Sequence, residues 1–358
     1  MRAALALARR GWGSTWPNPA VGCVLVRDGR VVGRGTTRPG GRPHAEAEAL
    51  AMAGDAARGA TAYVTLEPCS HHGRTPPCAD ALIAAGIVRV VIGCEDPYPQ
   101  VNGAGIARLR GAGLEVVTGV LRAEAEAVHE GFLTRIRQGR PMVTLKLAST
   151  LDGRIAAKDG RSQWITGPEA RRAAHALRGQ HDAVLAGVGT VLADDPELTC
   201  RIPGFRRVPD LRVVVDSHLR TRLTAKLIAT ARTVPTWLLH RTGADPGRRE
   251  AMLGAGVRLF EVPAAEPGID LAAGLRALAE AGLTRVLVEG GAQVAGALLR
   301  AGLVDRIAWF HAPSVMGGDG WPAAQAFGVT APDGMPRFIR TAARPVGGDL
   351  LTEFRRAA

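Results

Sequence analysis

The stretch TLEPCSHHGRTPPCADAL, residues 65–82, places Cys69 and Cys78 with eight residues between them. Cysteines that share a metal through a tight turn are usually separated by only two to about four residues. Three interpretations are therefore open: a metal site with an enlarged turn, a disulfide, or two unrelated buried thiols. The residues around the stretch help to choose between them.

The segment RPHAEAEAL, residues 42–50, supplies two polar groups upstream, His44 and Glu46, at the start of a predicted helix. A neutral imidazole and two thiolates form a three-ligand zinc set that leaves a fourth position for water. Glu46 can reach that water, and a carboxylate there can move protons between the nucleophile and a leaving amine. This H-x-E … P-C … C pattern is typical of zinc-dependent nucleobase deaminases.

Each of these residues has a plainer explanation when it is taken singly. His44 could cap a helix, and the two cysteines could be packed apolar side chains. Together with Pro68 before Cys69 and the strand-like ATAYVTLE, residues 60–67, the set favours a metal site. A disulfide remains geometrically possible but is disfavoured in a reducing compartment.

The enlarged turn itself, SHHGRTPP at residues 70–77, has a predicted role. It can loop over the open metal position and bring His71, His72 and Arg74 near the substrate. Imidazole and guanidinium groups suit a polar heterocycle or a phosphate. We therefore predict a metal site whose turn forms a substrate lid.

The composition predicts two ordinary globular domains in the cytoplasm. The 358 residues exceed the ~250–300 that one core usually serves, and 46% of them are hydrophobic. Five cysteines, an odd number, disfavour a secreted disulfide framework. The apolar run at residues 3–8 is shorter than the ~7–15-residue core of a signal peptide. No run approaches the ~18–20 apolar residues that span a bilayer, so no membrane partner is expected.

The net charge of +12 has several interpretations. A basic chain can bind nucleic acid or small phosphorylated ligands, or it can simply come from an arginine-rich proteome. Only 4% of the residues are aromatic and no aromatic–basic stripe is present, which weakens a single-strand-binding function. The charge alone does not choose between these interpretations.

A recurring pattern predicts the fold class. A helix-like run, an Ala-Gly pair and a Val/Ile-rich run follow one another, for example in residues 81–93 and 277–291. Glycine suits the left-handed end of a helix, and β-branched runs suit buried strands. We therefore predict an α/β fold with mostly parallel sheets. A helix ending near Gly139 and Pro141 places the domain boundary there, giving domains 1–139 and 140–358.

The second domain carries different chemistry. Lys146 lies within the predicted strand MVTLKLAST, residues 142–150, and is either a surface lysine or a substrate group. The segment VLVEGGAQVAGALL, residues 286–299, reads as a strand, a Gly-Gly turn and a helix. A helix start of this kind favours a pyrophosphate, although it lacks the G-x-G-x-x-G fingerprint and could be only a tight turn.

The first domain resembles the deaminase half of the bifunctional riboflavin-biosynthesis deaminase–reductase family, which has a cytidine-deaminase-like α/β/α fold. The resemblance rests on NPAVGCVLV at 18–26, PHAEAEAL at 43–50 and the opening stretch. It implies a zinc site in which Glu46 is the proton shuttle, with polar groups that contact the pyrimidine. The implied ligands are His44, Cys69 and Cys78, and the implied substrate contacts are Asn18, His71 and Arg74. Asn18 could instead be only a turn residue between two prolines.

One segment departs from the family pattern. The family commonly carries EDPNP followed by a basic residue, whereas residues 95–106 here read EDPYPQVNGAGI, with Tyr98 and Ala104 at the differing positions. Asp96, Asn102 and Gly103 remain expected ligand contacts. A phosphate contact from this loop is not implied.

The second domain is similar to the reductase half of the same family, which has a dihydrofolate-reductase-like fold and uses NADPH. The matching segments are 145–156, 162–167, 178–201, 213–220 and 288–299, so the resemblance covers most of the chain except residues 221–275 and the C-terminus. Implied cofactor contacts are Ala148, Trp164, Thr190, Asp194, Ser217, Gly291, Ala292, Gln293, Val294, Ala295, Gly296 and Ala297. Implied substrate contacts are Ser162, Arg178, Leu198, Arg201 and Glu289, with Lys146 and Glu289 as catalytic groups.

The resemblance implies a two-step enzyme that deaminates a phosphorylated diaminopyrimidine at zinc and then reduces its ribosyl group to ribityl with NADPH. A nucleic-acid editor with a basic RNA-binding tail is the alternative from another class. A chain that retains only one activity is a further alternative. We expect no nucleic-acid partner, and we expect a homo-oligomer because symmetric assembly is common.

Overall fold

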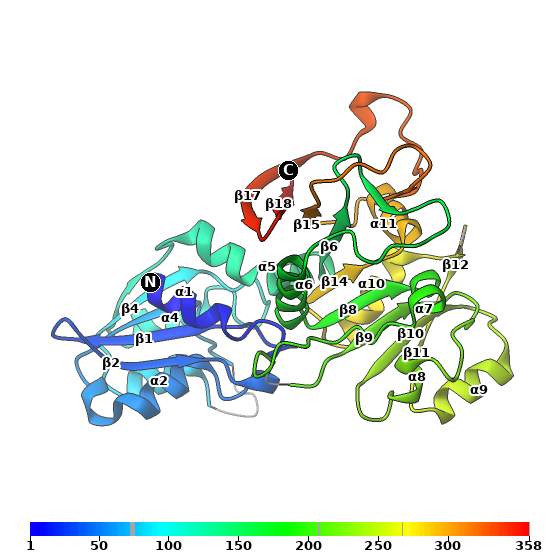
Figure 1. The fold of residues 1–358 in the computed structure, drawn as a ribbon. Coiled ribbons are helices and arrows are strands. Elements are labelled where there is room, and N and C mark those ends of the chain that lie inside the picture. Colours follow the sequence, from blue (N-terminus) through cyan, green and yellow to red (C-terminus); the bar gives the residue numbers. More distant parts are fainter. Residues whose placement is uncertain (72–75, 207, 267, 358) are drawn as a thin grey trace. The chain divides into compact units, whose positions relative to one another are not determined.

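The computed structural model describes residues 1–71, 76–206, 208–266 and 268–357 (Figure 1). The chain separates into two units, Met1–Gly139 and Arg140–Ala358. Within the described ranges, no helix combines the length and the apolar character that crossing a bilayer requires.

The first unit is built on a five-stranded sheet with the order β2-β1-β3-β4-β5. Strands β3, β4 and β5 are parallel, as the alternating pattern predicts, whereas β1 pairs antiparallel with both β2 and β3. The β1–β2 hairpin turns at Asp28 and Gly29, which both have positive φ. The strands are β1 Gly22–Arg27, β2 Arg30–Thr36, β3 Thr61–Leu66, β4 Arg89–Cys94 and β5 Glu115–Val117. The helices are α1 Arg2–Arg9, α2 Ala45–Ala53, α3 Cys78–Ala84, α4 Ala104–Gly111 and α5 Arg122–Gln138, with 3₁₀ turns Pro39–Gly41 and Gly54–Ala57.

Helix α2 lies directly on the main chain of β2. A Cβ atom built on Gly33 would come 2.3 Å from the Ala49 carbonyl oxygen, and one on Gly35 would come 2.1 Å from that of Ala45. Only glycine permits this approach, because any larger residue would force the helix outward. The two glycines therefore set the short distance between α2 and the main chain of β2.

The core of the first unit is apolar and closely packed. It includes Leu25 in β1, Ile92 in β4 and Leu109 in α4, all of which are fully buried. Truncating one of these side chains to alanine costs ~2–5 kcal/mol. This core keeps the ends of the strands and helices in place, and the polar groups of the unit lie at those ends.

The second unit is built on a nine-stranded sheet with the order β11-β10-β9-β8-β14-β6-β15-β18-β17. The strands from β11 to β15 in this order are parallel, and the β17–β18 hairpin adds antiparallel strands. The strands are β6 Met142–Ser149, β8 Ala183–Gly187, β9 Arg212–Val215, β10 Thr236–Arg241, β11 Arg258–Val262, β14 Arg285–Glu289, β15 Arg306–His311, β17 Phe338–Val346 and β18 Asp349–Arg356. The predicted α/β class is confirmed.

Helices and small elements connect these strands. The helices are α6 Pro168–Gly179, α7 Val188–Asp194, α8 Lys226–Ala229, α9 Pro246–Gly254, α10 Leu271–Glu280 and α11 Ala292–Arg300. The small elements are β7 Arg154–Ala156 with β16 Trp321–Pro322, β12 Ala264–Ala265 with β13 Gly268–Ile269, and the 3₁₀ turn Pro332–Gly334. In a parallel sheet the carboxyl ends of the strands meet at one edge, which is where ligands usually bind.

The start of β14 is held by a buried carboxylate. Asp182 accepts hydrogen bonds from the main-chain N–H groups of Thr284 and Arg285 at 2.7 and 2.9 Å, and from the Thr284 hydroxyl at 2.7 Å. These bonds satisfy both the carboxylate and the strand start away from water. They fix the position of β14, whose other end carries Glu289.

Candidate active sites

The predicted metal ligands meet in the first unit. His44 is the residue before α2, Cys69 follows β3, and Cys78 begins α3. Their ligand atoms all lie within 4.8 Å of one another, with His44 Nδ1 3.3 Å from Cys78 Sγ and 3.7 Å from Cys69 Sγ. Tetrahedral zinc with Zn–N of ~2.1 Å and Zn–S of ~2.3 Å needs N···S separations of about 3.6 Å. The donor set therefore fits zinc.

The three ligands are electrostatically coupled. The Cys78 thiol donates to Cys69, which is the largest reason that the pKa of Cys69 falls to about 4. The same bond raises the pKa of Cys78 well above its usual range. Hydrogen bonding with Cys69 raises the pKa of His44. One thiolate beside an imidazole is a ready ligand pair for a divalent cation.

Glu46 lies beside the metal ligands. Its side chain is buried, at 3% exposure, and its Oε2 has no hydrogen-bond partner among the described residues. Burial raises its pKa to about 7, although the charge of His44 acts in the opposite direction. Such a carboxyl can take up and release a proton near neutral pH.

A cavity of about 310 Å³ opens at this cluster. Asn18, His71 and Asp96 line it together with Glu46. The Asn18 amide donates to the Gly41 carbonyl at 2.9 Å, so Asn18 also has a structural bond. The His71 ring lies 6.1 Å from that of Tyr98. Arg74, like His72, lies outside the described residues.

Two arginines that the sequence reasoning missed line the same cavity. They are Arg42, two residues before His44, and Arg135 in α5. Arg135 also donates to the Pro17 carbonyl at 3.4 Å. The position of Arg42, two residues before the H-x-E motif, is a sequence signal for it, whereas no sequence signal connects Arg135 to the site.

In the second unit, Lys146 and Glu289 occupy paired positions on the neighbouring strands β6 and β14. Arg178, in α6, holds the Glu289 carboxylate through Nε and Nη2 at 2.8 and 2.9 Å. Burial alone would raise the pKa of Glu289, but Arg178 and then Lys146 outweigh it and lower the pKa to about 2. Burial lowers the pKa of Lys146. An anionic carboxylate and a cation therefore stand side by side near the carboxyl edge of the sheet.

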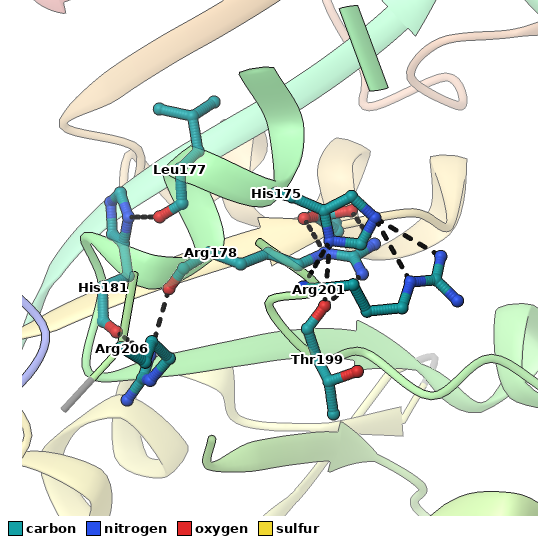
Figure 2. A network of polar contacts seen from close by, with 8 residues as sticks. His175, Leu177, Arg178, His181, Thr199, Arg201 and Arg206 are labelled. Carbon is teal, nitrogen blue, oxygen red and sulfur yellow. Dashed lines mark hydrogen bonds and ion pairs between the residues drawn. The ribbon is translucent and has the colours of Figure 1, made fainter. Parts of the chain in front are cut away.

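A network of polar contacts extends from Arg178 (Figure 2). The Thr199 carbonyl accepts from Arg178 Nη1 at 2.9 Å and lies 3.1 Å from His175 Nδ1. The guanidinium group of Arg201 lies 3.3 Å from His175 Nε2. Burial, Arg178 and Arg201, in that order, lower the pKa of His175 and favour the neutral ring. His175 was not singled out from the sequence.

A second cavity, of about 460 Å³, lies beside this network and is basic. Arg171, Arg172, His175 and Arg201 line it.

Leu198 differs from the other implied substrate contacts, because its side chain is buried in the apolar core. Any contact of Leu198 with a ligand would therefore come from its main chain.

The Gly-Gly turn after β14 gives the predicted helix start. No side chain of the described residues caps α11 at Gly291, so its first N–H groups are available to an anion. A Cβ atom on Gly290 would come 3.0 Å from the Thr190 side chain, so the main chain passes close to Thr190. Farther along α11, Val294, Ala295 and Gly296 are buried. The arrangement fits a dinucleotide pyrophosphate at the start of the helix.

The remaining implied cofactor contacts are dispersed over several elements. Trp164 is 68% exposed, with the Arg171 guanidinium 4.4 Å from its ring centre. Asp194 ends α7, and Ser217 follows β9 at the same edge as Gly187. The others, half-buried except for the exposed Gln293, are Ala148, Ala292, Gln293 and Ala297. Ser162, an implied substrate contact, is also half-buried.

The comparisons with known proteins agree with both sites. Residues 1–94 match the cytidine and deoxycytidylate deaminase zinc-binding region, and residues 141–351 match the RibD C-terminal domain. The fold and sites thus define a bifunctional enzyme that joins a zinc-dependent deaminase to an NADPH-dependent reductase. More particularly, the chain belongs to the RibD family of riboflavin biosynthesis proteins.

Individual relatives match over nearly the full length. The riboflavin biosynthesis protein RibD of Escherichia coli is 44% identical over 361 residues, which covers 98% of this chain and 96% of that protein. Acinetobacter baumannii RibD has a TM-score of 0.88 at 36% identity, covering 100% of this chain and 98% of that one. A diaminohydroxyphosphoribosylaminopyrimidine deaminase/5-amino-6-(5-phosphoribosylamino)uracil reductase from Thermotoga maritima has a TM-score of 0.86 at 36% identity, covering 100% and 97%.

Proposed function

We propose that residues 1–139 deaminate 2,5-diamino-6-ribosylamino-4(3H)-pyrimidinone 5′-phosphate and that residues 140–358 then reduce the ribosyl group of the product to ribityl. The observation that carries the proposal is the His44, Cys69 and Cys78 cluster with the buried Glu46 beside it, on one chain with the Lys146–Glu289 pair. The names of the full-length relatives support the substrate assignment.

In the deaminase site, His44, Cys69 and Cys78 hold the zinc ion, which when bound supplies Lewis-acid activation of water. Glu46 takes the proton of the attacking water and delivers it to the amino group that leaves as ammonia. Asn18, His71 and Arg74 orient the pyrimidine, and the charge of Arg42 and Arg135 suits the ribotide phosphate.

In the reductase site, bound NADPH would supply the hydride, and the uncapped N–H groups at the start of α11 would hold its pyrophosphate. The other proposed cofactor contacts are the residues that the resemblance implies, namely Ala148, Trp164, Thr190, Asp194, Ser217 and residues 291–297. Glu289, fixed by Arg178, accepts a hydrogen bond from a substrate hydroxyl, and Lys146 donates to the ribosyl oxygen as the ring opens. Arg201 neutralises the phosphate. Ser162 and the Leu198 main chain complete the substrate site.

We further propose that the enzyme works in the cytoplasm as a homo-oligomer without a nucleic-acid partner. None of the five cysteines, which all lie within the described residues, is in a disulfide, which suits a reducing compartment. The two cavities are of a size for small ligands. Salt-dependent retention on immobilised RNA would contradict the small-molecule assignment.

Metal removal should separate the two activities. After dialysis against a zinc chelator, we expect the diaminopyrimidine ribotide to cause no NADPH oxidation, whereas the pre-deaminated ribotide is still reduced. Added zinc should restore the first reaction. Absorbance of NADPH follows both, and the untreated enzyme is the control. Failure of the untreated enzyme to oxidise NADPH with the pre-deaminated ribotide would overturn the reductase assignment.

Replacing Arg135 tests the phosphate contact of the deaminase site. We expect Arg135→Ala to raise the KM of deamination about 10–100-fold, because a hydrogen bond to a charged group is worth ~1.5–3 kcal/mol. Arg137→Ala, at an exposed position of the same helix, is the matched control. An unchanged KM for the ribotide in Arg135→Ala would remove Arg135 from the phosphate site.

A further inference from the structure

Glu67 is a buried carboxylate that the reaction described above does not use. It follows β3, stands two residues before Cys69 and is only 4% exposed. Its Oε2 accepts main-chain N–H bonds from Asp96 at 3.3 Å and Gly103 at 3.1 Å. Its Oε1 accepts the N–H of Ile106 at 3.1 Å. Both carboxylate oxygens therefore accept hydrogen bonds from the main chain of one stretch, residues 96–106.

That stretch, residues 96–106, has turn hydrogen bonds of its own, such as the one from the Val101 N–H to the Tyr98 carbonyl at 2.8 Å, but these bonds are local and do not attach it to the rest of the unit. Helix α4 begins after Gly103, which has no side chain that could cap it. The helix start leaves N–H groups that need acceptors, and Glu67 supplies them from a distant part of the sequence. The carboxylate therefore replaces a local cap, and it also holds the Asp96 end of the stretch.

The same stretch packs against the turn that carries Cys69. A Cβ atom on Gly105 would come 2.0 Å from the Pro68 carbonyl oxygen and 3.1 Å from Glu67 Oε1. The Glu67 N–H donates to the Cys94 carbonyl at 3.0 Å, which ties the end of β3 to the end of β4. Glu67 is therefore at the centre of the contact between the metal turn and residues 96–106.

Residues of this stretch form part of the deaminase cavity. Asp96, Tyr98 and Val101 line it together with Glu67 itself and the ligand Cys69. We propose that Glu67 is a positioning residue that holds residues 96–106 against the metal turn and thereby sets the substrate affinity of the deaminase. The proposal rests on the proposed deaminase function. It concerns the wall of the cavity rather than the reacting atoms.

Glu67→Gln tests the proposal with little change of shape. The amide turns one acceptor into a donor that faces a main-chain N–H, so at least one of the three bonds is lost. We expect the KM of deamination to rise about tenfold with kcat nearly unchanged, which is the pattern of lost ground-state binding. We also expect faster amide hydrogen exchange in residues 95–106.

The control variant is Glu115→Gln, which changes an exposed carboxylate of the same unit that pairs with Arg89 at the surface. Full zinc content and unchanged reduction of the pre-deaminated ribotide show that Glu67→Gln is folded. If it is not folded, Gly105→Ala is the second variant, since it pushes the same stretch from Pro68 and should raise KM with Glu67 intact.

The outcomes separate the hypotheses. A raised KM with faster exchange in residues 95–106 supports the positioning role. An unchanged KM with unchanged exchange would overturn it. A loss of zinc with a lower kcat and a constant KM would also overturn it, because Glu67 would then act only by stabilising the metal site. Wild-type protein without deaminase activity would contradict the proposed function instead, and the exchange measurement would still decide whether Glu67 holds the stretch.

Discussion

Glu46→Gln is expected to lower the kcat of deamination about 10²–10⁴-fold, the usual effect of removing a general acid–base group. The amide keeps the size of the side chain but cannot carry the proton from water to the leaving amine. Since the ligands His44, Cys69 and Cys78 are unchanged, zinc content should stay at the wild-type level.

The bifunctional chain offers its own control for this variant. NADPH oxidation with the diaminopyrimidine ribotide should slow about 10²–10⁴-fold, while oxidation with the pre-deaminated ribotide should match the wild type. Glu48→Gln on the same helix, which pairs with Arg38, is the matched substitution and should deaminate normally. A Glu46→Gln enzyme that deaminates at the wild-type rate would show that another group moves the proton.

Arg178→Met is expected to destabilise the second unit by ~3–5 kcal/mol, because it leaves the Glu289 carboxylate buried without its partner. Urea unfolding followed by tryptophan fluorescence measures the loss. The double variant Arg178→Met/Glu289→Gln should recover much of the stability without recovering reductase activity, since it removes the unpaired charge. Equal stabilities of wild type and single variant would show that the pair contributes nothing.

The same pair predicts a pH dependence of stability. The pKa of Glu289 is lowered from 4.5 to about 2, so its ionisation stabilises the folded state. This contribution is fully present above pH 4.5 and is lost as the pH falls through 2. In Arg178→Met the lowering should disappear, and the free energy of unfolding should become less dependent on pH between 2 and 4.5.

The sequence predicted those parts of the sites in which the catalytic or ligating residues lie close together along the chain. His44 with Glu46, and Cys69 with Cys78, each form a local pattern, and the structure brings these two patterns together. The α/β class was likewise readable, because helix-ending glycines alternate with β-branched runs. The antiparallel β1–β2 hairpin was not predicted, although Asp28 and Gly29 form an Asp-Gly turn signal between two apolar runs.

The residues that the sequence did not reveal act across long distances in the chain. Arg135 reaches the deaminase cavity from α5, and His175 meets Arg201 only when α6 folds against the loop after α7. Glu67 stands within the opening motif, yet its partners lie about 30 to 40 residues later. No local pattern specifies such contacts, because they depend on how the elements pack.

The glycines of β2 extend the constraint on the metal centre beyond the residues that touch it. Any side chain at position 33 or 35 would displace α2 and, with it, the imidazole and carboxyl group at its start. In evolutionary terms, these two positions on a plain edge strand should tolerate mutation as poorly as the ligands themselves. A saturation library selected for riboflavin-independent growth should therefore retain glycine there, although neither position carries a functional group.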